Sequence, residues 1–494
     1  MHSNLIFDKP ESNCGIFGIF KHNQASTLTY YGLLALQHRG QEASGIVTSF
    51  FDKSKNNVTF NLRKGKGLVS EVFNDEKIFT DELKGDSAIG HNRYSTTGSN
   101  ILINVQPFVV KYKSGNLAIS HNGNLTNARI LRGKLIEEGA IFQTSSDTEV
   151  ILHLISRSKF ENQTDQIFNA LNQVTGAYSL LILTDNNLYA CRDPYGVRPL
   201  CIGKYEDSYV FASETCAFDL IGAEYLREVE PGEIVFFNIK NNQITLKSIF
   251  LDNKQSKPKK CIFEFIYFSR PDSVVFNENV DKIRRQLGKR LAEENPVNST
   301  NEKKLAIISV PDSSNTIAIG YNDQLRKMNY NCKFEIGLIR SHYIGRTFIQ
   351  SEQNKREFST RIKYNIVRGV LKERDVVVVD DSIVRGTTSR QLINLLKEGK
   401  PNKIHFRVAS PPILFPCQYG MDFPSREELI ANKHNGDISK IKKELEVDSL
   451  EYLSFEGLIS CTPEKSEEFY CTACFTGKYP IPIDNDFHKD QNES

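Results

Sequence analysis

The chain has 494 residues, of which 39% are hydrophobic and 25% are charged, and its formal net charge is +2. This length predicts two or three domains, each able to bury its own core. The composition is that of a soluble globular protein, and the small net charge gives no reason to expect nucleic acid or an anionic membrane as a partner. No apolar run approaches the roughly 20 residues that span a bilayer. We therefore expect a cytoplasmic protein.

The chain opens with a short leader, residues 1–13, followed by a strand-like run, CGIFGIF, at residues 14–20. The leader carries acidic residues and lacks the apolar core of a secretory signal. If the leader is removed, Cys14 carries both a thiol and a free α-amine, whose pKa of about 7.7–8.0 lets it act as the base for that thiol. The alternative is that Cys14 is a small buried hydrophobe in a strand.

The rest of the chain falls into two parts that differ in sequence pattern. Residues 14–250 contain short apolar or alternating runs between Gly, Asn and Asp, which predicts a strand-rich domain with a few helices, such as one over 148–158. Examples of the expected strands are 117–120, 178–183, 209–212 and 234–237. The polar, Lys-rich residues 252–260 are typical of a linker.

The second half, residues 261–480, alternates helical and strand patterns and predicts an α/β domain. We expect a helix over 280–294 and a buried strand over 305–310. Four consecutive Val at 376–379 favour a parallel strand covered on both faces. The polar tail, 484–494, is expected to be flexible.

Polar groups that strand packing does not require occur in four segments of the first half, at residues 36–42, 90–98, 121–125 and 145–149. An amide hydrolase with a Cys nucleophile needs a cation for the substrate carboxylate, and Arg93 and Arg39 are candidates. Asp147 suits the substrate ammonium, with a helix N-cap as the equal alternative. The Asn122 amide and the Gly123 N–H suit the oxyanion, although Asn-Gly is also a strong turn dipeptide.

The most specific run of the chain is VVVVDDSIVRGTTS, residues 376–389. A buried strand ends in Asp380 and Asp381, which can accept hydrogen bonds from two ribose hydroxyls, directly or through Mg²⁺. A Gly-containing loop and the start of a helix follow, where backbone N–H groups and hydroxyls form an anion cradle. The cradle residues are Arg385, Gly386, Thr387, Thr388 and Ser389. An ordinary strand-turn-helix would leave two adjacent acids at a strand end without a partner, which is costly.

Ten Cys in a reducing compartment favour catalysis or metal binding over disulfides. Cys471 and Cys474 form a Cys-x-x-Cys, which by itself fits a zinc site, a redox pair or neither.

Residues 14–18, 91–96 and 121–124 resemble the N-terminal-nucleophile glutamine amidotransferase domain. The resemblance implies a four-layer α/β/β/α sandwich in which Cys14 attacks the side-chain amide of glutamine. It assigns Arg93 and Asp147 to the amino-acid end of glutamine, and Asn122 and Gly123 to the oxyanion. It also implies that residues 1–13 are a propeptide that the protein removes itself.

Residues 376–389 resemble the phosphoribosyl pyrophosphate fingerprint of type I phosphoribosyltransferases, which implies a parallel-sheet domain with Mg²⁺. They are not a P-loop, because Gly-Lys-Ser/Thr is missing. Ser313 follows another strand, and we expect it near the metal with Asp380 and Asp381. Residues 343–350 resemble the loop that closes over pyrophosphate, where Arg346 would meet phosphate charge. The preceding Arg-Ser-His, 340–342, departs from the Lys-Asn-Arg of that loop.

The flanks of Cys261 and Cys417, and residues 471–480, resemble amidophosphoribosyltransferases that carry a [4Fe–4S] cluster. This resemblance implies a cluster held by Cys261, Cys417, Cys471 and Cys474. Zinc bound by four Cys is the chemical alternative.

From Cys14 to about residue 480, the chain is similar to the glutamine phosphoribosylpyrophosphate amidotransferase family. The resemblance implies that glutamine, phosphoribosyl pyrophosphate and water give 5-phosphoribosylamine, glutamate and pyrophosphate, the first committed step of purine synthesis, with ammonia passed between two sites. It further implies a homotetramer inhibited by purine nucleotides.

Two alternatives remain at this point. One is another glutamine-dependent synthase of the same N-terminal type. An asparagine synthetase would need a Ser-Gly-Gly-x-Asp-Ser loop, and the sequence has none. The other is a phosphoribosyl-binding regulatory protein without catalytic activity, which would need a basic DNA-binding module.

Overall fold

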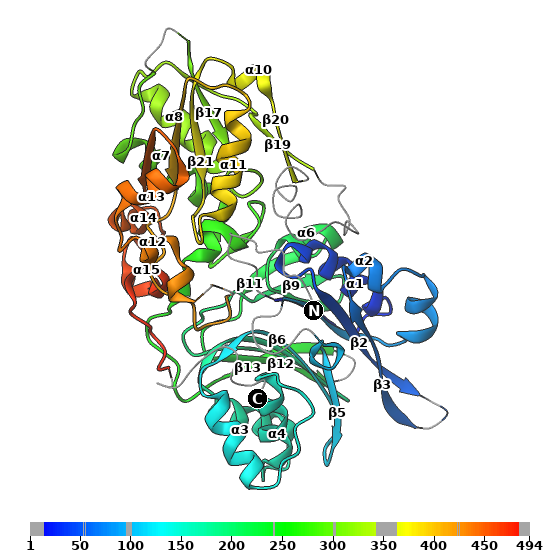
Figure 1. The fold of residues 1–494 in the computed structure, drawn as a ribbon. Helices are drawn as coiled ribbons and strands as arrows, with labels where there is room; N and C mark the ends of the chain where they lie inside the picture. The colour runs from blue at the N-terminus through cyan, green and yellow to red at the C-terminus, as the bar shows by residue number, and fades with distance from the viewer. Residues whose placement is uncertain are drawn as a thin grey trace.

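The chain forms two sheet-based domains, which lie one above the other in Figure 1. The structure is a computed structural model and describes residues 14–52, 54, 56–94, 101–240, 243–299, 303–341, 363–421, 423 and 425–483. The leader and the tail from residue 484 lie outside the described residues. Among the described residues, no helix combines the length and the hydrophobicity needed to cross a membrane.

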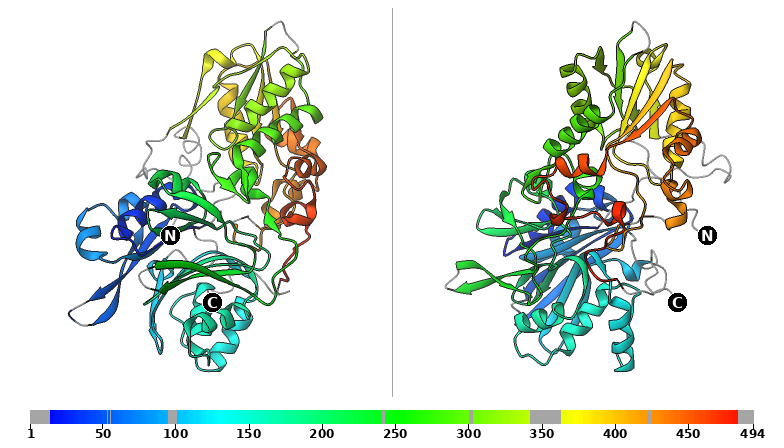
Figure 2. Two further views of the ribbon diagram at one scale, coloured as in Figure 1. Left: turned by 180° about the vertical axis from the view of Figure 1, so that it is seen from behind. Right: turned by 90° about the vertical axis from the view of Figure 1, so that its left-hand side faces the viewer.

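The first domain contains two antiparallel sheets that stack face to face, with α1, α2 and α6 over one sheet and α3 and α4 over the other (Figures 1 and 2). The seven-stranded sheet has the order β11-β9-β10-β1-β4-β2-β3, and the six-stranded sheet has the order β13-β12-β8-β7-β6-β5. The strands are β1 Gly15–Phe20, β2 Ala43–Asp52, β3 Asn57–Lys66, β4 Ser87–Arg93, β5 Phe108–Tyr112, β6 Gly115–Leu125, β7 Gly176–Thr184, β8 Leu188–Arg192, β9 Cys201–Tyr205, β10 Ser208–Ala212, β11 Glu224–Glu228, β12 Glu233–Lys240 and β13 Gln243–Phe250. The helices are α1 Ala25–Ala35, α2 Val69–Val72, α3 Ala128–Glu137, α4 Thr148–Arg157, α5 Gln163–Leu171 and α6 Cys216–Ile221.

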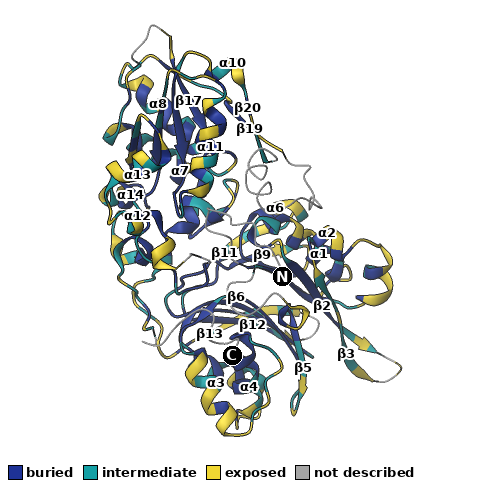
Figure 3. Cartoon of the chain, viewed as in Figure 1, coloured by how far each residue is buried: buried dark blue, intermediate teal, exposed yellow. Residues whose placement is uncertain are grey.

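Alternation along β1 explains the layers of this domain. Ile16 and Phe20 belong to the core between the two sheets, whereas Phe17 and Ile19 pack in the core beneath α1. Because successive side chains of a strand point to opposite faces, an uninterrupted apolar run such as GIFGIF is buried on both sides. Figure 3 shows the result as buried strands between more exposed helices.

The second domain contains a five-stranded sheet with the order β18-β17-β21-β22-β23, and every pairing in it is parallel. Its strands are β17 Leu305–Ser309, β18 Cys332–Phe334, β21 Asp375–Asp380, β22 Lys403–Val408 and β23 Ser449–Tyr452, and short strand pairs are formed by β14 Lys260–Cys261, β24 Tyr470–Cys471, β15 Val274–Val275, β16 Glu278–Asn279, β19 Leu338–Arg340 and β20 Tyr364–Ile366. Its helices are α7 Val280–Glu294, α8 Asn315–Lys327, α10 Arg368–Leu371, α11 Thr387–Lys397, α12 Ile430–Lys433, α13 Ile438–Leu445, α14 Phe455–Ser460 and α15 Ala473–Thr476.

The four Val of β21 are divided between two cores. Val376 and Val378 pack with α11, and Val377 and Val379 pack with α7 and α8 on the other face. The strand is therefore covered on both sides, as its β-branched run predicts. Together the two domains confirm the predicted two-domain α/β fold, an antiparallel double-sheet domain followed by a parallel-sheet domain.

The end of the described chain runs back from the second domain to the first. After α15 the chain leads from the parallel-sheet domain toward the six-stranded sheet in Figure 1. There the Thr126 hydroxyl donates to the carbonyl oxygen of Pro482 at 2.9 Å.

Candidate active site

Cys14 lies immediately before β1, at the edge of the seven-stranded sheet. Pairing of β1 with β4 places Gly15 opposite Asn92, so that Cys14 lies beside Arg93 and Tyr94. Cys14 is 8% exposed, and its thiol lies 3.6 Å from the carbonyl oxygen of Tyr94. Burial raises the pKa of Cys14 to about 12, although the positive charge of Arg93 acts in the opposite direction. The thiol is therefore protonated at neutral pH and needs a base before it can attack.

Asn122 and Gly123 lie inside β6, where they pair with Ser179 and Tyr178 of β7. The alternative interpretation of this dipeptide as a hairpin turn is therefore wrong. The Asn122 side chain is fully buried, and neither its oxygen nor its nitrogen has a hydrogen-bond partner among the described residues. A buried amide without a partner costs about 1–3 kcal/mol. Such a group suits a substrate oxygen that arrives only during the reaction.

The backbone conformation and the close surroundings of position 123 require a glycine. The φ of Gly123 is +148°, and a Cβ at this position would lie 2.0 Å from the carbonyl oxygen of Ala177. A contact under 3.0 Å with backbone has no cheap relief, so the main chain of this segment passes where only glycine fits.

A hydrogen bond joins the two sheets next to these residues. His91 Nε2 of β4 lies 3.1 Å from the carbonyl oxygen of His121 in β6. Burial, with Arg93 nearby, lowers the pKa of His91 to about 3, so the ring is neutral and donates to this carbonyl. This hydrogen bond holds β4, which pairs with β1 next to Cys14, against β6, which carries Asn122.

Asp147 and Arg93 supply opposite charges beside the thiol. Both act on Cys14, and Asp147 also raises the pKa of Arg93, which burial lowers. Asp147 occupies the N-cap position of α4, as the alternative predicts, but its carboxylate makes no capping hydrogen bond. Its Oδ2 instead accepts from the Leu125 N–H at 2.9 Å. A carboxylate and a guanidinium next to one thiol match the ammonium and carboxylate of an amino acid.

The prediction that Arg39 binds the substrate carboxylate is wrong. The Arg39 guanidinium is 1% exposed and donates to both carboxylate oxygens of Glu264, at 2.8 and 3.0 Å, and to Glu214. Burial acts to lower the pKa of Arg39, but the two carboxylates outweigh it and raise that pKa. Arg39 is therefore not available for a substrate carboxylate. Its Nε points instead to the Cys14 carbonyl oxygen, at 3.4 Å, and supports the backbone of the nucleophile.

The sequence analysis missed Glu264 and Arg198, which extend this ion pair across the domain boundary. Glu264 follows Cys261 in a short helical turn, Glu264–Phe268, of the second domain. Arg198 lies 3.6 Å from Glu264 and also donates through Nε to the carbonyl oxygen of Tyr419 at 3.1 Å. The only signal in the sequence was an acid inside an apolar segment, IFEFIYF, because a buried charge needs a partner.

A second polar centre lies at the carboxyl end of β21. Asp380 and Asp381 are 2% and 0% exposed. Ser313 donates to Asp381 at 2.5 Å, and Ser314 bridges Asp380 and Asp381 at 3.1 and 3.2 Å. The structure therefore brings Ser313 to Asp381 and Ser314 to both carboxylates, at the edge where ligands of open α/β sheets bind.

The loop after Asp381 leads into the N-terminus of α11. Gly386 has a φ of +81°, and a Cβ there would lie 2.3 Å from Ile430. Thr387 is exposed, Thr388 half-buried and Ser389 buried. The first N–H groups of a helix have no partner within it, so this end of α11 suits an anion. Arg385 forms an ion pair with Glu428 at 2.9 Å. Arg346 and the rest of the predicted loop, 343–350, lie outside the described residues.

The four cysteines of the predicted cluster come together from three segments. Parallel pairing of β14 with β24 aligns Cys261 with Cys471, and the carbonyl oxygen of Cys474 accepts from Phe415 in the segment that leads to Cys417. All four thiols are free and buried. Burial, followed by the charges of the other three sulfurs, raises the pKa of Cys474 well above its usual range. In the described part of the chain, no three His, Cys, Asp or Glu side chains are arranged to hold a single metal ion, such as the zinc of a closed tetrahedral site.

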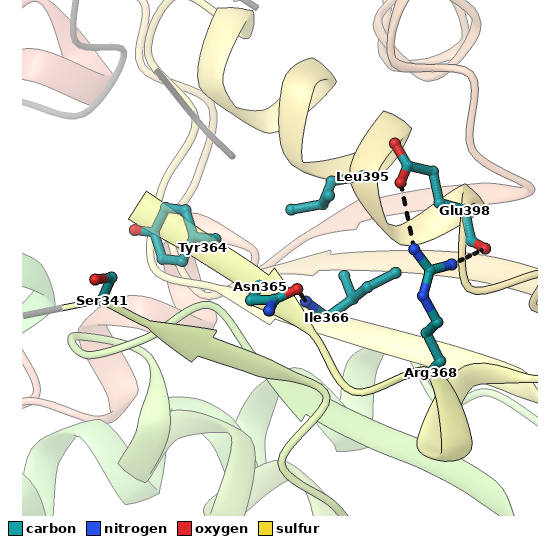
Figure 4. Close-up of a pocket in the computed structure, with 7 residues that line it drawn as sticks. All are labelled: Ser341, Tyr364, Asn365, Ile366, Arg368, Leu395 and Glu398. Carbon is teal, nitrogen blue, oxygen red and sulfur yellow. Dashed lines mark hydrogen bonds and ion pairs between the residues drawn. The ribbon is translucent and has the colours of Figure 1, made fainter. Parts of the chain in front are cut away.

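A separate pocket of about 340 Å³ lies where β19 and β20 meet the C-terminal end of α11 (Figure 4). It is lined by Ser341, Tyr364, Asn365, Ile366, Arg368, Leu395 and Glu398. Arg368 points toward Glu398, at 3.7 Å. The pocket lies at the opposite end of α11 from Thr387 and belongs to neither polar centre.

Known proteins resemble both halves of this chain. A family model described as "Glutamine amidotransferase domain" matches residues 91–219. Amidophosphoribosyltransferase 2, chloroplastic, of Arabidopsis thaliana is 48% identical over 475 residues, 96% of this chain and 80% of that protein. Amidophosphoribosyltransferase of Bacillus subtilis (strain 168) is 46% identical over 477 residues, 96% of this chain and 95% of that protein.

Two solved structures also superpose on this chain over nearly its whole length. The structure of glutamine phosphoribosylpyrophosphate amidotransferase from B. subtilis, complexed with ADP and GMP, superposes with a TM-score of 0.85 at 45% identity, covering 96% of this chain and 98% of that chain. A second structure, described as the allosteric regulatory enzyme of purine biosynthesis, superposes with a TM-score of 0.86 at 45% identity, covering 96% of this chain and 97% of that chain. Identity of this order over nearly the whole of both chains places the protein in the amidophosphoribosyltransferase family.

Proposed function

We propose that the protein makes 5-phosphoribosylamine, glutamate and pyrophosphate from glutamine, phosphoribosyl pyrophosphate and water, the first step of purine biosynthesis. The observation that carries this proposal is the presence of two complementary centres on one chain. One is a buried thiol that feels the charges of Arg93 and Asp147, and the other is the carboxylate pair Asp380 and Asp381 before a loop suited to anions. The similarity to amidophosphoribosyltransferases along both halves disfavours a non-catalytic regulator.

In the first centre, Arg93 and Asp147 hold the amino-acid end of glutamine. The Cys14 sulfur attacks the side-chain carbonyl, the C–N bond breaks, and the thiol proton leaves with ammonia. The buried Asn122 amide and the Gly123 N–H receive the negative charge that develops on the carbonyl oxygen. Water then hydrolyses the thioester and releases glutamate.

In the second centre, the N–H groups of residues 385–389 receive the 5-phosphate of phosphoribosyl pyrophosphate, and Asp380 and Asp381 accept the ribose hydroxyls. Ammonia attacks C1, and pyrophosphate leaves with the electrons of the C1–O bond. Mg²⁺ binds proteins through one or two carboxylates together with substrate phosphates, so Asp380 and Asp381, with Ser313 hydrogen-bonded to Asp381, fit this ion. When bound, Mg²⁺ would neutralise charge on the leaving group. We expect Arg346 to meet the pyrophosphate.

Ammonia must pass between the centres without release, since in water it is protonated and loses its nucleophilicity. Support for a direct transfer is that β6 touches the second domain: Asn124 Nδ2 donates to the carbonyl oxygen of Gln418 at 2.9 Å. The test of the whole function is stoichiometry. With both substrates present, glutamate and pyrophosphate should form in equal amounts, and unequal amounts would contradict coupled transfer.

Removal of residues 1–13 gives Cys14 a free α-amine, which is the base that this proposal needs. The buried Cys14 thiol, with a pKa of about 12, needs a nearby acceptor, and an α-amine on the same residue has a pKa of about 7.7–8.0. We expect intact-mass analysis of the purified protein to give a chain that starts at Cys14. Full glutaminase activity in a chain that keeps the leader would refute the amine base.

The four cysteines fit a [4Fe–4S] cluster of structural role, because their sulfur atoms come from three segments to one buried place. Burial raises the pKa of Cys261 to about 12, so metal binding must release protons and couples to folding. We expect anaerobically purified protein to contain about four iron and four sulfide per chain. Exposure to air or a chelator should lower its thermal stability, whereas zinc without sulfide would establish the alternative.

The remaining proposals concern assembly and regulation. A neighbouring structure contains ADP and GMP, which supports purine nucleotides as effectors of this protein. We also propose a homotetramer in the cytosol, where reducing conditions keep cysteines out of disulfides.

A further inference from the structure

Two other backbone segments approach Gly123 closely. The carbonyl oxygen of Ala177 lies 2.0 Å from where a Gly123 Cβ would be. Gly420 of the second domain is also near, and its own Cβ would be 2.8 Å from the Gly123 carbonyl carbon and 2.9 Å from its oxygen. The Gly123 peptide is therefore in close contact with two other main chains, and one of them belongs to the other half of the protein.

The loop that carries Gly420, residues 417–420, is anchored at successive positions. Asn124 Nδ2 donates to the Gln418 carbonyl oxygen at 2.9 Å, and Arg198 donates to the Tyr419 carbonyl oxygen at 3.1 Å. The Tyr419 N–H donates to the Cys417 sulfur at 3.3 Å. Gly420 itself is buried and has a φ of +93°, so both its conformation and its surroundings require glycine.

We propose that loop 417–420 positions the oxyanion-binding segment of the glutaminase, so that the second domain completes the first active site. The inference rests on the proposed function, since it assigns Asn122 and Gly123 to the oxyanion. Preorganised donors lose much of their effect when their position shifts by a fraction of an ångström, because their alignment to the developing charge is what lowers the barrier. Gly420 and Asn124 are positioning residues in this account.

The test compares two glycine substitutions in the full-length enzyme. Gly420→Ala places a methyl against the Gly123 peptide. Gly477→Ala is the matched control: Gly477 has a φ of +72°, and its methyl would lie 2.8 Å from the Phe415 ring, away from Gly123. Both changes add backbone strain and crowding near the four cysteines. Asn124→Ala, which removes the side-chain bond to Gln418 without adding a methyl at a glycine position, is the milder third variant if Gly420→Ala does not fold.

Two readouts separate positioning from general damage. For Gly420→Ala we expect kcat for glutamine hydrolysis to fall about 10- to 100-fold, with KM for glutamine little changed, because Arg93 and Asp147 still bind the amino-acid end. Glutamate γ-semialdehyde adds a thiol to its carbonyl and so forms a tetrahedral adduct. Its inhibition constant should weaken by a similar factor, whereas that of glutamate should not.

Transfer from free ammonia should be kept in Gly420→Ala, and Gly477→Ala should keep both activities. If Gly420→Ala and Asn124→Ala retain the wild-type kcat and semialdehyde affinity, the loop does not position the oxyanion segment. Equal losses in Gly477→Ala would overturn the proposal in the same way. Failure of the proposed function is distinguishable, because the wild-type enzyme would then not hydrolyse glutamine at all.

Discussion

Replacing Cys14 with Ala is expected to abolish glutamine-dependent turnover, by more than about 10⁴-fold, while free ammonia still supports phosphoribosylamine formation. Loss of a covalent nucleophile removes the thioester route entirely, and effects of this size are typical of such residues. The second centre should not change, since Asp380, Asp381 and Ser313 all lie in the other domain. The measurement is pyrophosphate release with glutamine or with an ammonium salt as the nitrogen source.

Cys191→Ala is a suitable control for this experiment. Cys191 lies in β8 and is fully buried in the core under α4 and α5, so its loss can reduce stability without touching the site. It should keep both activities. If Cys14→Ala removed the ammonia-dependent reaction as well, the two centres would not act independently, and the assignment of separate sites would fail.

Local patterns predicted the elements that depend on local chemistry. The helix over 280–294 and the strand around the four Val are present as α7 and β21, because apolar periodicity and β-branched runs reflect burial directly. The pairing of acids with a following Gly-containing loop likewise predicted how Asp380, Asp381 and Gly386 lie at a strand end.

Long-range partners were not predictable in the same way. Arg39 has the chemistry for a substrate carboxylate, but Glu264, 225 residues away, occupies its guanidinium. Asn122 and Gly123 have the composition of a turn, yet pairing with β7 keeps them in a strand. In both cases a residue far away in the chain decides the outcome, and local propensity carries no information about it.

A substitution in the second domain is expected to impair phosphoribosyl transfer and leave the reactivity of Cys14 intact. Asp381→Asn should reduce phosphoribosyl transfer about 100-fold or more, whether glutamine or ammonia supplies nitrogen, because it removes one of the two buried charges at the ribose and metal end of the site. The amide has nearly the shape of the carboxylate, but it presents N–H groups to hydroxyls that donate to Asp381, those of Ser313, Ser314 and Ser382. Labelling of Cys14 by an electrophilic glutamine analogue should persist.

Asp375 provides the matched control for this change, because it is equally buried and begins β21, whereas Asp381 directly follows the other end of that strand. Asn402 donates to it there, at 2.5 Å. Ligands of a parallel sheet bind beyond the carboxyl ends of its strands, so Asp375→Asn should lower stability and leave the rate of transfer unchanged. Equal losses of transfer in the two variants would mean that the charge of β21 supports the fold rather than the reaction. A selective loss in Asp381→Asn, with Cys14 still reactive, would place phosphoribosyl chemistry at that end of the sheet.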